Sequence, residues 1–209
     1  MENETIKNIL IFLKEKEGKK LPQGWFKLLT TEEIIQELEN KPDDVQYIHK
    51  GGISLMNSNI KKLPNDLHVR GYLNLNNCKQ LKELPTNLRV DGHLWLEDTD
   101  ITKLPDDLYV AGLLNVRNSK LIETPFHLYV VSTLILSYNK ELIKISDKTH
   151  VGYDLDLRGC IKLRELPNDL FVGHDLYIQE TPLAEKYTDD EIYGIIENNG
   201  GQIRGKIFR

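Results

Sequence analysis

The chain repeats one pattern of 20 or 21 residues from about residue 51 to residue 183. Each unit reads Leu-Pro, two polar residues, Leu-x-Val, a Gly, Leu-x-Leu, two polar residues, a small residue, then Leu or Ile. Units begin at Leu63, Leu84, Leu104, Thr124, Ile145 and Leu166, at intervals of 21, 20, 20, 21 and 21 residues. A fixed period of this size is typical of a solenoid, in which each unit buries its apolar face by stacking on its neighbours. The repeat therefore predicts the fold and favours binding over chemistry.

Each unit contains two stretches in which apolar and polar residues alternate, such as residues 88–90 and 94–96. Alternation with period two sends the apolar side chains inward and their neighbours outward, as in a strand. The Leu-Pro step allows a rigid corner, and a unit this short has room for two strands and no helix. We expect a turn with positive φ at the glycine between the two stretches, which is Gly71, Gly92, Gly112, Gly152 or Gly173.

A small side chain stands three residues after the second Leu of every unit. The set is Ser58, Cys78, Thr99, Ser119, Asn139, Cys160 and Thr181. We predict an inward ladder that satisfies backbone groups at a turn. Its two cysteines are four coils apart, about 19 Å at one strand spacing per coil, whereas a disulfide needs Cα atoms within about 7 Å. Both thiols should be reduced core residues without a catalytic role, which agrees with a cytoplasmic setting.

Residues 94–101, Leu-Trp-Leu-Glu-Asp-Thr-Asp-Ile, resemble the leucine-rich repeat core, L-x-L-x-x-N/C-x-L. With the Leu-Pro step, the unit is similar to the short repeats of secreted bacterial ubiquitin-ligase effectors. It resembles more closely the LPxxLxVxGxLxL arrays of uncharacterised bacteriophage proteins. The chain has no room for the effectors' large catalytic domain. The phage resemblance implies a small protein that binds and blocks a host factor, such as a defence protein.

We therefore expect a mainly β, leucine-rich-repeat-like solenoid over residues 46–183, with a right-handed β-helix as the alternative because the Leu-x-Val strand and the Gly are unusual for leucine-rich repeats. Residues 1–45 should form an N-terminal helical cap, with helices over residues 5–16 and from Thr30 or Thr31 to before Pro42. Residues 184–209 should form a C-terminal cap. It comprises a helix that begins at a Thr188–Glu191 capping box and a closing strand over residues 202–208.

The composition argues against several classes of function. A formal net charge of −5 disfavours specific nucleic-acid binding. The chain contains no run of about 18 apolar residues, so we expect no membrane span and a cytoplasmic location, that of the host cell if the protein is phage-encoded. The histidines lack metal-ligand spacing, and no phosphate loop or nucleophile motif is present. We expect no metal, no cofactor and no enzymatic activity, and the oligomeric state stays open.

Two outward rows of side chains are candidate partner surfaces, because exposed aromatic residues and arginine are enriched in interface hot spots. The row that we favour, on the Leu-x-Leu strands, comprises Tyr72, His93, Trp95, Leu113, Asn115, Arg117, Ile135, Asp156 and Tyr177. The secondary row, on the Leu-x-Val strands, comprises His68, Arg89, Tyr109, Tyr129, His150 and Phe171. The structural alternative is that aromatic residues simply favour strands and stack on cross-strand neighbours.

The leading hypothesis is a non-enzymatic protein–protein interaction module. The alternative is a ligand- or glycan-binding solenoid, or a polysaccharide hydrolase, that uses Asp154, Asp156 and Asp175. Asp154 and Asp175 occupy equivalent positions, which places them about 5 Å apart, the separation of the two carboxyl groups in retaining glycosidases. A stripe of like charges is also what keeps a solenoid soluble.

Overall fold

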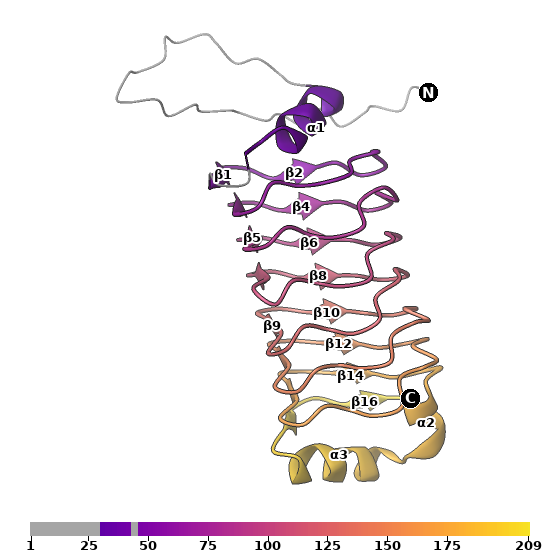
Figure 1. Cartoon of the computed structure of the whole chain (residues 1–209). Helices are drawn as coiled ribbons and strands as arrows, with labels where there is room; N and C mark the ends of the chain where they lie inside the picture. The colour runs from indigo at the N-terminus through magenta and orange to yellow at the C-terminus, as the bar shows by residue number, and fades with distance from the viewer. Residues whose placement is uncertain (1–29, 43–45) are drawn as a thin grey trace, which may run out of the picture.

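The computed structural model of the protein describes residues 30–42 and 46–209. The helix expected over residues 5–16 lies outside these residues. The described chain winds into coils that stack along one axis into an elongated solenoid (Figure 1). Each coil adds one short strand to each of two parallel sheets. The predicted mainly β solenoid is confirmed, and a β-helix cross-section is compatible with the same arrangement.

The Leu-x-Val stretches form sheet A and the Leu-x-Leu stretches form sheet B, each with eight strands in the described residues. Sheet A contains β1 (Tyr47–His49), β3 (Leu67–Val69), β5 (Arg89–Val90), β7 (Tyr109–Val110), β9 (Tyr129–Val130), β11 (His150–Val151), β13 (Phe171–Val172) and β15 (Gln202–Ile203). Sheet B contains β2 (Ile53–Ser54), β4 (Leu73–Asn74), β6 (Leu94–Trp95), β8 (Leu114–Asn115), β10 (Leu134–Ile135), β12 (Leu155–Asp156), β14 (Leu176–Tyr177) and β16 (Ile207–Phe208). Equivalent residues pair from coil to coil, as Leu94 does with Leu114.

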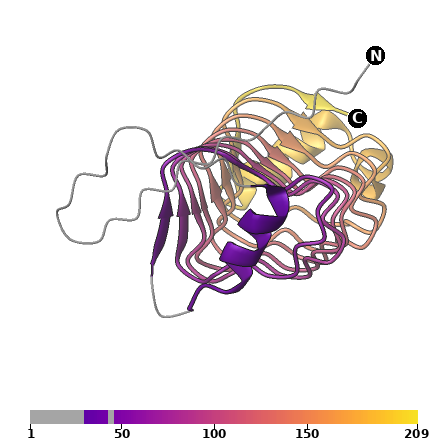
Figure 2. The ribbon, with the colours of Figure 1, turned by 90° about the horizontal axis from the view of Figure 1, so that it is seen from above.

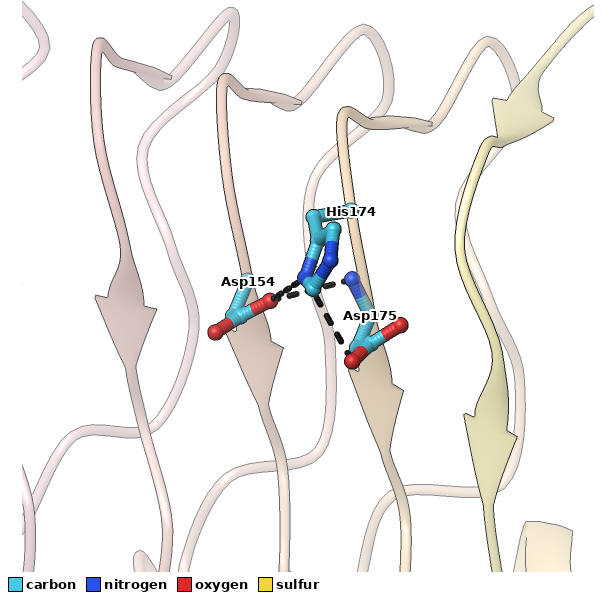
Figure 3. A group of neighbouring side chains, drawn as sticks. All are labelled: Asp154, His174 and Asp175. Carbon is cyan, nitrogen blue, oxygen red and sulfur yellow. Dashed lines mark hydrogen bonds and ion pairs between the residues drawn. The ribbon is translucent and has the colours of Figure 1, made fainter.

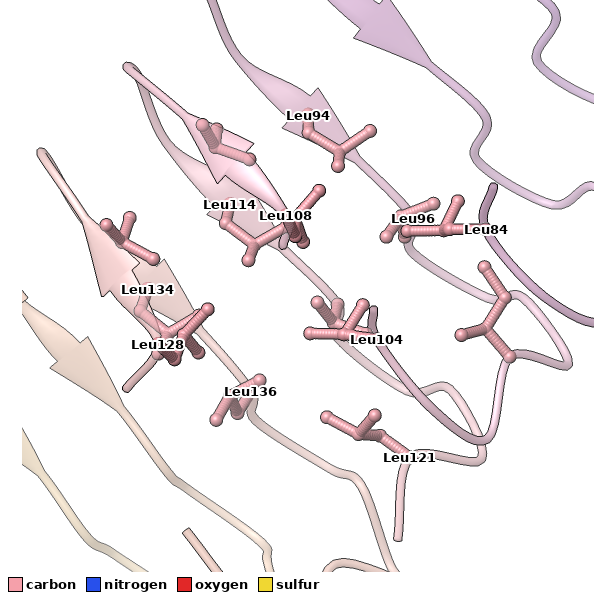
Figure 4. Packing of buried hydrophobic residues seen from close by; sticks show 14 of the residues in the cluster. Leu84, Leu94, Leu96, Leu104, Leu108, Leu114, Leu121, Leu128, Leu134 and Leu136 are labelled. Carbon is pink, nitrogen blue, oxygen red and sulfur yellow. The ribbon is translucent and has the colours of Figure 1, made fainter. Parts of the chain in front are cut away.

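The core lies between the two sheets and a third face, which the Leu-Pro segments form. Figure 4 shows buried leucines of all three faces together in this core, among them Leu114, Leu108 and Leu104. In the described chain, the third face contains one isolated β-bridge, between Glu123 and Lys144, in place of strands. Burying one such leucine side chain stabilises the fold by about 1.5–3 kcal/mol, so the stack is held together chiefly by apolar rows.

The expectation of positive φ at the interstrand glycines is wrong. Among the described glycines, positive φ occurs at Gly159 and Gly200. The interstrand glycines instead allow close approach of neighbouring coils. A Cβ atom at Gly152 would lie 2.0 Å from the Val131 carbonyl oxygen, and one at Gly173 would lie 2.1 Å from the Gly152 carbonyl oxygen.

The interstrand glycine also changes place along the stack. In the coils of β4, β6 and β8 it is the second residue after the sheet A valine, as Gly92 is after Val90. In the coils of β12 and β14 it is the first, as Gly173 is after Val172. The distance from the valine to the first sheet B leucine is four residues in both cases. The residue that follows the displaced glycine therefore carries a side chain, Tyr153 in one coil and His174 in the next.

Left-handed backbone lies at two other corners of the coil, which the sequence reasoning missed. One corner immediately precedes the small-residue ladder and comprises Asn57, Asn77, Asp98, Asn118, Tyr138, Gly159 and Glu180. The other precedes the Leu-x-Val stretch and comprises Asp66, Asn87, His127, Lys148, Asp169 and Gly200. Asn and Asp tolerate this conformation better than other side chains, which explains the polar residues at these corners.

The small-residue ladder is confirmed as an inward row that satisfies backbone carbonyls. Thr99 Oγ1 donates to the Leu96 carbonyl at 2.9 Å, and Ser119 Oγ donates to the same oxygen at 2.8 Å. The Asn139 amide nitrogen donates to the carbonyls of Val116 and Leu136 at 2.7 and 2.9 Å. Each bond satisfies a carbonyl at a tight corner, where leaving it buried and unpaired would cost free energy.

A helix lies across each end of the stack. The helix α1 (Thr31–Glu39) covers the first coil (Figure 2), is capped by a Thr30–Glu33 capping box, and buries Ile34 and Leu38. The Glu39 carboxylate accepts from the Lys61 backbone N–H at 2.7 Å, which ties the helix to the coil. An amphipathic helix in this position shields apolar core that the last coil of an open stack would expose.

At the opposite end, α2 (Pro182–Lys186) and α3 (Asp189–Asn198) replace the third face of the last coil (Figure 1). The predicted Thr188–Glu191 capping box is present, and Ile192 and Ile196 are buried. The expectation of one closing strand over residues 202–208 is wrong, because Arg204, Gly205 and Lys206 carry the chain from β15 in sheet A to β16 in sheet B. The C-terminal segment therefore completes a coil.

The close approach at the interstrand glycines gives a stability prediction. Gly152→Ala should destabilise the protein by about 1–3 kcal/mol, because the new methyl group meets backbone that cannot yield without shifting a coil. Gly194→Ala in α3 is the matched control, since a Cβ atom there meets nothing within 4 Å. It should stabilise the protein by about 0.5–1 kcal/mol, the usual gain in a helix. Urea unfolding followed by circular dichroism measures both, and an unaltered midpoint for Gly152→Ala would contradict the argument.

Candidate functional site

The favoured row of side chains lies on the outer face of sheet B, the face turned away from the core. The strand register aligns Trp95, Asn115, Ile135, Asp156 and Tyr177 across consecutive coils. Tyr72, His93 and Leu113 form a parallel row, one residue before the first leucine of each coil.

Two members of the favoured set are hydrogen-bonded to neighbouring residues of the sheet. Asn115 is buried and accepts from the Arg117 backbone N–H at 2.9 Å. Asp156 is also buried, and its two oxygens accept from Arg158 Nε and Nη2 at 2.9 and 2.7 Å. Asn115 and Asp156 therefore have a structural role within the sheet.

Three aromatic rings of the favoured set come together over β4 and β6. We call Tyr72, His93 and Trp95 the Trp95 cluster. The ring centroids of Tyr72 and Trp95 lie 5.6 Å apart at an interplanar angle of 64°, and those of His93 and Trp95 lie 5.3 Å apart at 51°. His93 Nδ1 accepts from the Leu113 backbone N–H at 2.9 Å, which fixes the imidazole. Tyr72 and His93 are exposed and Trp95 is half-buried, so the cluster is both ordered and accessible.

The secondary row forms a stacked ladder on the outer face of sheet A. His150 stacks on Tyr129 and on Phe171, with ring centroids 4.7 and 4.3 Å apart and interplanar angles of 18° and 7°. The Arg89 guanidinium lies 4.3 Å from the centre of the Tyr109 ring, and that of Arg204 lies 5.1 Å from the Phe171 ring. His150 is therefore covered on both faces by its neighbours, and Phe171 by His150 and Arg204. This geometry supports the structural role of the secondary row.

Two of the three candidate acids meet a histidine that the sequence reasoning treated as isolated. Asp154 precedes β12, and His174 and Asp175 precede β14 in the next coil (Figure 3). His174 Nδ1 lies 2.7 Å from Asp154 Oδ1 and 3.4 Å from Asp175 Oδ2. We call these three residues the acid–histidine cluster. The signal in the sequence was a histidine next to one of two equivalent aspartates, one coil apart.

The acid–histidine cluster is a local source of negative charge. Burial, followed by the negative charges of Asp154 and Asp175, raises the pKa of Tyr177 on β14. Asp156 is separate from the cluster because its carboxylate is engaged by Arg158. The three acids proposed for catalysis therefore do not act as one group.

The two cysteines are free and fully buried, as predicted. Cys78 Sγ donates to the Leu55 carbonyl at 3.0 Å, and Cys160 Sγ donates to the Leu136 carbonyl at 3.2 Å. Burial raises the pKa of Cys78, and it raises the pKa of Cys160 to about 12. A nucleophilic cysteine requires a lowered pKa and access to solvent, so neither thiol is suited to catalysis.

A cavity of about 900 Å³ lies between the third face and the two C-terminal helices. Ile143, Leu166, Leu183 and Ile192 contribute to its apolar lining, and its charged residues are of both signs: Lys144, Lys162, Arg164, Asp147 and Glu165. The sequence reasoning missed this cavity because it depends on where α2 and α3 fold back. None of the three candidate acids lines it.

Comparisons with known proteins returned no match among protein-family models, curated proteins or solved structures. In the described part of the chain, no helix combines the length and apolar character needed to cross a membrane.

The burial of the thiols gives a reactivity prediction. At pH 8 the folded protein should not react with a thiol-specific reagent such as 5,5′-dithiobis(2-nitrobenzoate), because both cysteines stay protonated and covered. Reaction of both thiols should follow once urea unfolds the chain, since an unfolded cysteine has a pKa of about 8.5. Absorbance at 412 nm measures the reaction. Rapid labelling of Cys160 in the folded state would show that this part of the core is open.

Proposed function

We propose that the chain is a non-enzymatic protein-interaction module that contacts its partner through the outer face of sheet B. The Trp95 cluster carries the proposal. It combines three aromatic side chains on two adjacent coils, with two exposed and one half-buried. Aromatic residues of this kind supply large contact area at low entropic cost and dominate binding energy in protein interfaces.

The geometry of the rings supports sheet B over sheet A. In the sheet A ladder, rings lie within 18° of parallel and cover one another's faces. In the Trp95 cluster, Tyr72 meets Trp95 edge to face at 64°, and His93 is tilted against Trp95 at 51°, so the rings do not cover one another's faces. Part of each ring surface therefore stays available to a partner.

Charged residues stand two positions after Trp95 and after its register partner Asn115, as expected for the rim of an interface. Glu97 lies 3.8 Å from Arg117, whose guanidinium lies 5.0 Å from the centre of the Tyr138 ring. Leu113 lies next to His93 in the same row and extends the apolar area. The sheet beneath is pinned by backbone hydrogen bonds on both sides, so a partner meets a preorganised surface.

The finer part of the proposal is that the protein is phage-encoded and blocks a host protein, such as a defence protein, in the host cytoplasm. Its support is the resemblance of the Leu-Pro units to bacteriophage leucine-rich-repeat-like arrays. The fold is compatible with this role, because solenoids present extended binding surfaces.

The alternative proposal is a glycan-binding or hydrolytic solenoid. The observation that favours it is the proximity of Asp154 and Asp175, whose oxygen atoms lie within 4.8 Å of each other. Two observations weigh against it. The Asp156 carboxylate is ion-paired with Arg158, and the 900 Å³ cavity lies on another face of the solenoid.

The interaction proposal predicts that partner recovery depends on the Trp95 cluster. Tagged wild-type protein should recover a stoichiometric partner from host lysate, and Tyr72→Ser combined with Trp95→Ser should weaken that complex by about 30-fold or more, the scale of a hot spot. The purified complex would be measured by surface plasmon resonance.

Two control variants separate this surface from the others. Tyr129→Ser removes an aromatic side chain from sheet A that is 50% exposed, and Phe126→Ser removes one that is 56% exposed near the third face. Both should leave the complex intact. Equal binding by the double variant would refute the proposed surface, and repeated failure to recover any partner would count against the function itself.

A further inference from the structure

Three potential metal ligands from two consecutive coils converge at the start of β12 and β14. Asp154, His174 and Asp175 each offer one ligand atom, and these atoms all lie within 4.8 Å of one another. Figure 3 shows the imidazole between the two carboxylates, with the three side chains on the same side of the sheet. The set is one imidazole nitrogen and two carboxylate oxygens.

The charge of this cluster is not balanced as it is at other acids of the solenoid. Asp100 is paired with Lys82 at 2.6 Å and Lys120 at 3.0 Å, and these hydrogen bonds lower its pKa to about 2. Within the described residues, His174 is the one basic side chain in ion-pair contact with Asp154 or Asp175. The side chains of the two aspartates are only 21% and 14% exposed. Two adjacent, largely buried carboxylates therefore share one histidine, an arrangement that a divalent cation would stabilise.

A second histidine–aspartate pair shows what a balanced site looks like in the same fold. His68 Nε2 lies 2.8 Å from Asp91 Oδ2, nearly the separation of His174 and Asp154. The third member is Arg89, whose Nε lies 2.9 Å from Asp91 Oδ1. An arginine thus stands where the acid–histidine cluster has a second carboxylate, so this pair has no need of a cation.

The side chains of the acid–histidine cluster are held in place by their surroundings. Asp154 Oδ1 accepts from the Asp175 backbone N–H at 3.0 Å, and Asp175 Oδ1 accepts from the Lys206 backbone N–H at 2.7 Å. The imidazole of His174 stacks on Tyr153, with ring centroids 4.5 Å apart and an interplanar angle of 5°. Contacts of this kind orient metal ligands and raise affinity.

We propose that Asp154, His174 and Asp175 bind one divalent transition-metal ion. We take Zn²⁺ as the example for the geometry and for the experiment. Zinc accepts histidine nitrogen and carboxylate oxygen at about 2.0–2.2 Å, so two ligand atoms around it lie about 3–3.5 Å apart. The observed separations from His174, 2.7 and 3.4 Å, are close to this range, and the two carboxylate oxygens, which lie within 4.8 Å of each other, would close around the ion. Mg²⁺ and Ca²⁺ prefer oxygen ligands alone, so the histidine selects against them.

The ion would leave coordination positions open to solvent, because the described residues supply three ligands and His174 is 46% exposed. The site is separate from the Trp95 cluster, since β6 and β12 are separated by β8 and β10 in sheet B. Its existence is independent of the proposed interaction surface.

Isothermal titration calorimetry with ZnCl₂ and EDTA-treated full-length protein at pH 7.5 tests the proposal. One saturable site should appear that a tenfold excess of Mg²⁺ does not displace. Asp154→Asn and His174→Ala should each weaken binding by at least about tenfold, the scale expected when a metal site is disturbed. His68→Ala is the matched control, since it removes the histidine of the arginine-balanced pair, and it should bind Zn²⁺ as the wild type does.

Thermal unfolding with and without Zn²⁺ gives a second measurement. Zinc should raise the melting temperature of the wild type and of His68→Ala, because a ligand that binds the native state stabilises it. It should not raise that of His174→Ala. Asp154→Asn preserves the shape of the side chain, so it keeps the test valid if the alanine variant is unstable. Absence of saturable binding, or binding that survives both cluster variants, overturns the proposal.

Discussion

The structure depends on backbone hydrogen bonds between equivalent residues of consecutive coils. In sheet B, the N–H groups of Leu73 and Leu75 donate to the carbonyls of His93 and Trp95 in the next coil, at 2.9 and 2.8 Å. In sheet A the direction is reversed, and the N–H of Tyr109 donates to the Leu88 carbonyl of the preceding coil at 3.1 Å. Because these ladders are parallel and in register, every position of the repeat becomes a row along the axis. The core, the corners and both outer faces follow from that single constraint.

Rows of equivalent residues have opposite consequences for different side chains. Aromatic and apolar side chains gain from being stacked at one strand spacing, as Tyr129, His150 and Phe171 do. Small hydroxyl, thiol and amide groups gain too, because each can reach a carbonyl of its own or the preceding coil. Acidic side chains are destabilised by the same stacking, because it brings identical charges close together. The charge of Asp100 is compensated by two lysines and that of Asp156 by Arg158.

The sequence was sufficient wherever the period alone determines direction. It predicted the inward ladder from Ser58 to Thr181, the burial of both cysteines, the two strand types and the Thr188 capping box, since each follows from local pattern and register. The prediction of positive φ at Gly92 and its equivalents was wrong. A repeated glycine can mark either a tight turn or a close approach of two backbones, and the sequence pattern is the same in both cases. The sequence reasoning missed the partnership of His174 with Asp154 because that contact joins different positions of neighbouring units. The cavity beside α3 could not be predicted from the repeat, because it depends on how α2 and α3 interrupt the repeat.

The displaced glycine shows how a strict repeat can acquire an irregular function. In the coils of β4, β6 and β8, glycine occupies the position two residues before the first sheet B leucine, and that position can present no side chain. In the coils of β12 and β14, the glycine has moved back by one residue while the spacing from valine to leucine is unchanged. The position that glycine has left can then carry a surface side chain, which is Tyr153 in the coil of β12 and His174 in the coil of β14. A solenoid of this kind can therefore gain or lose a functional group by exchanging two neighbouring residues within one coil, with no change in coil length.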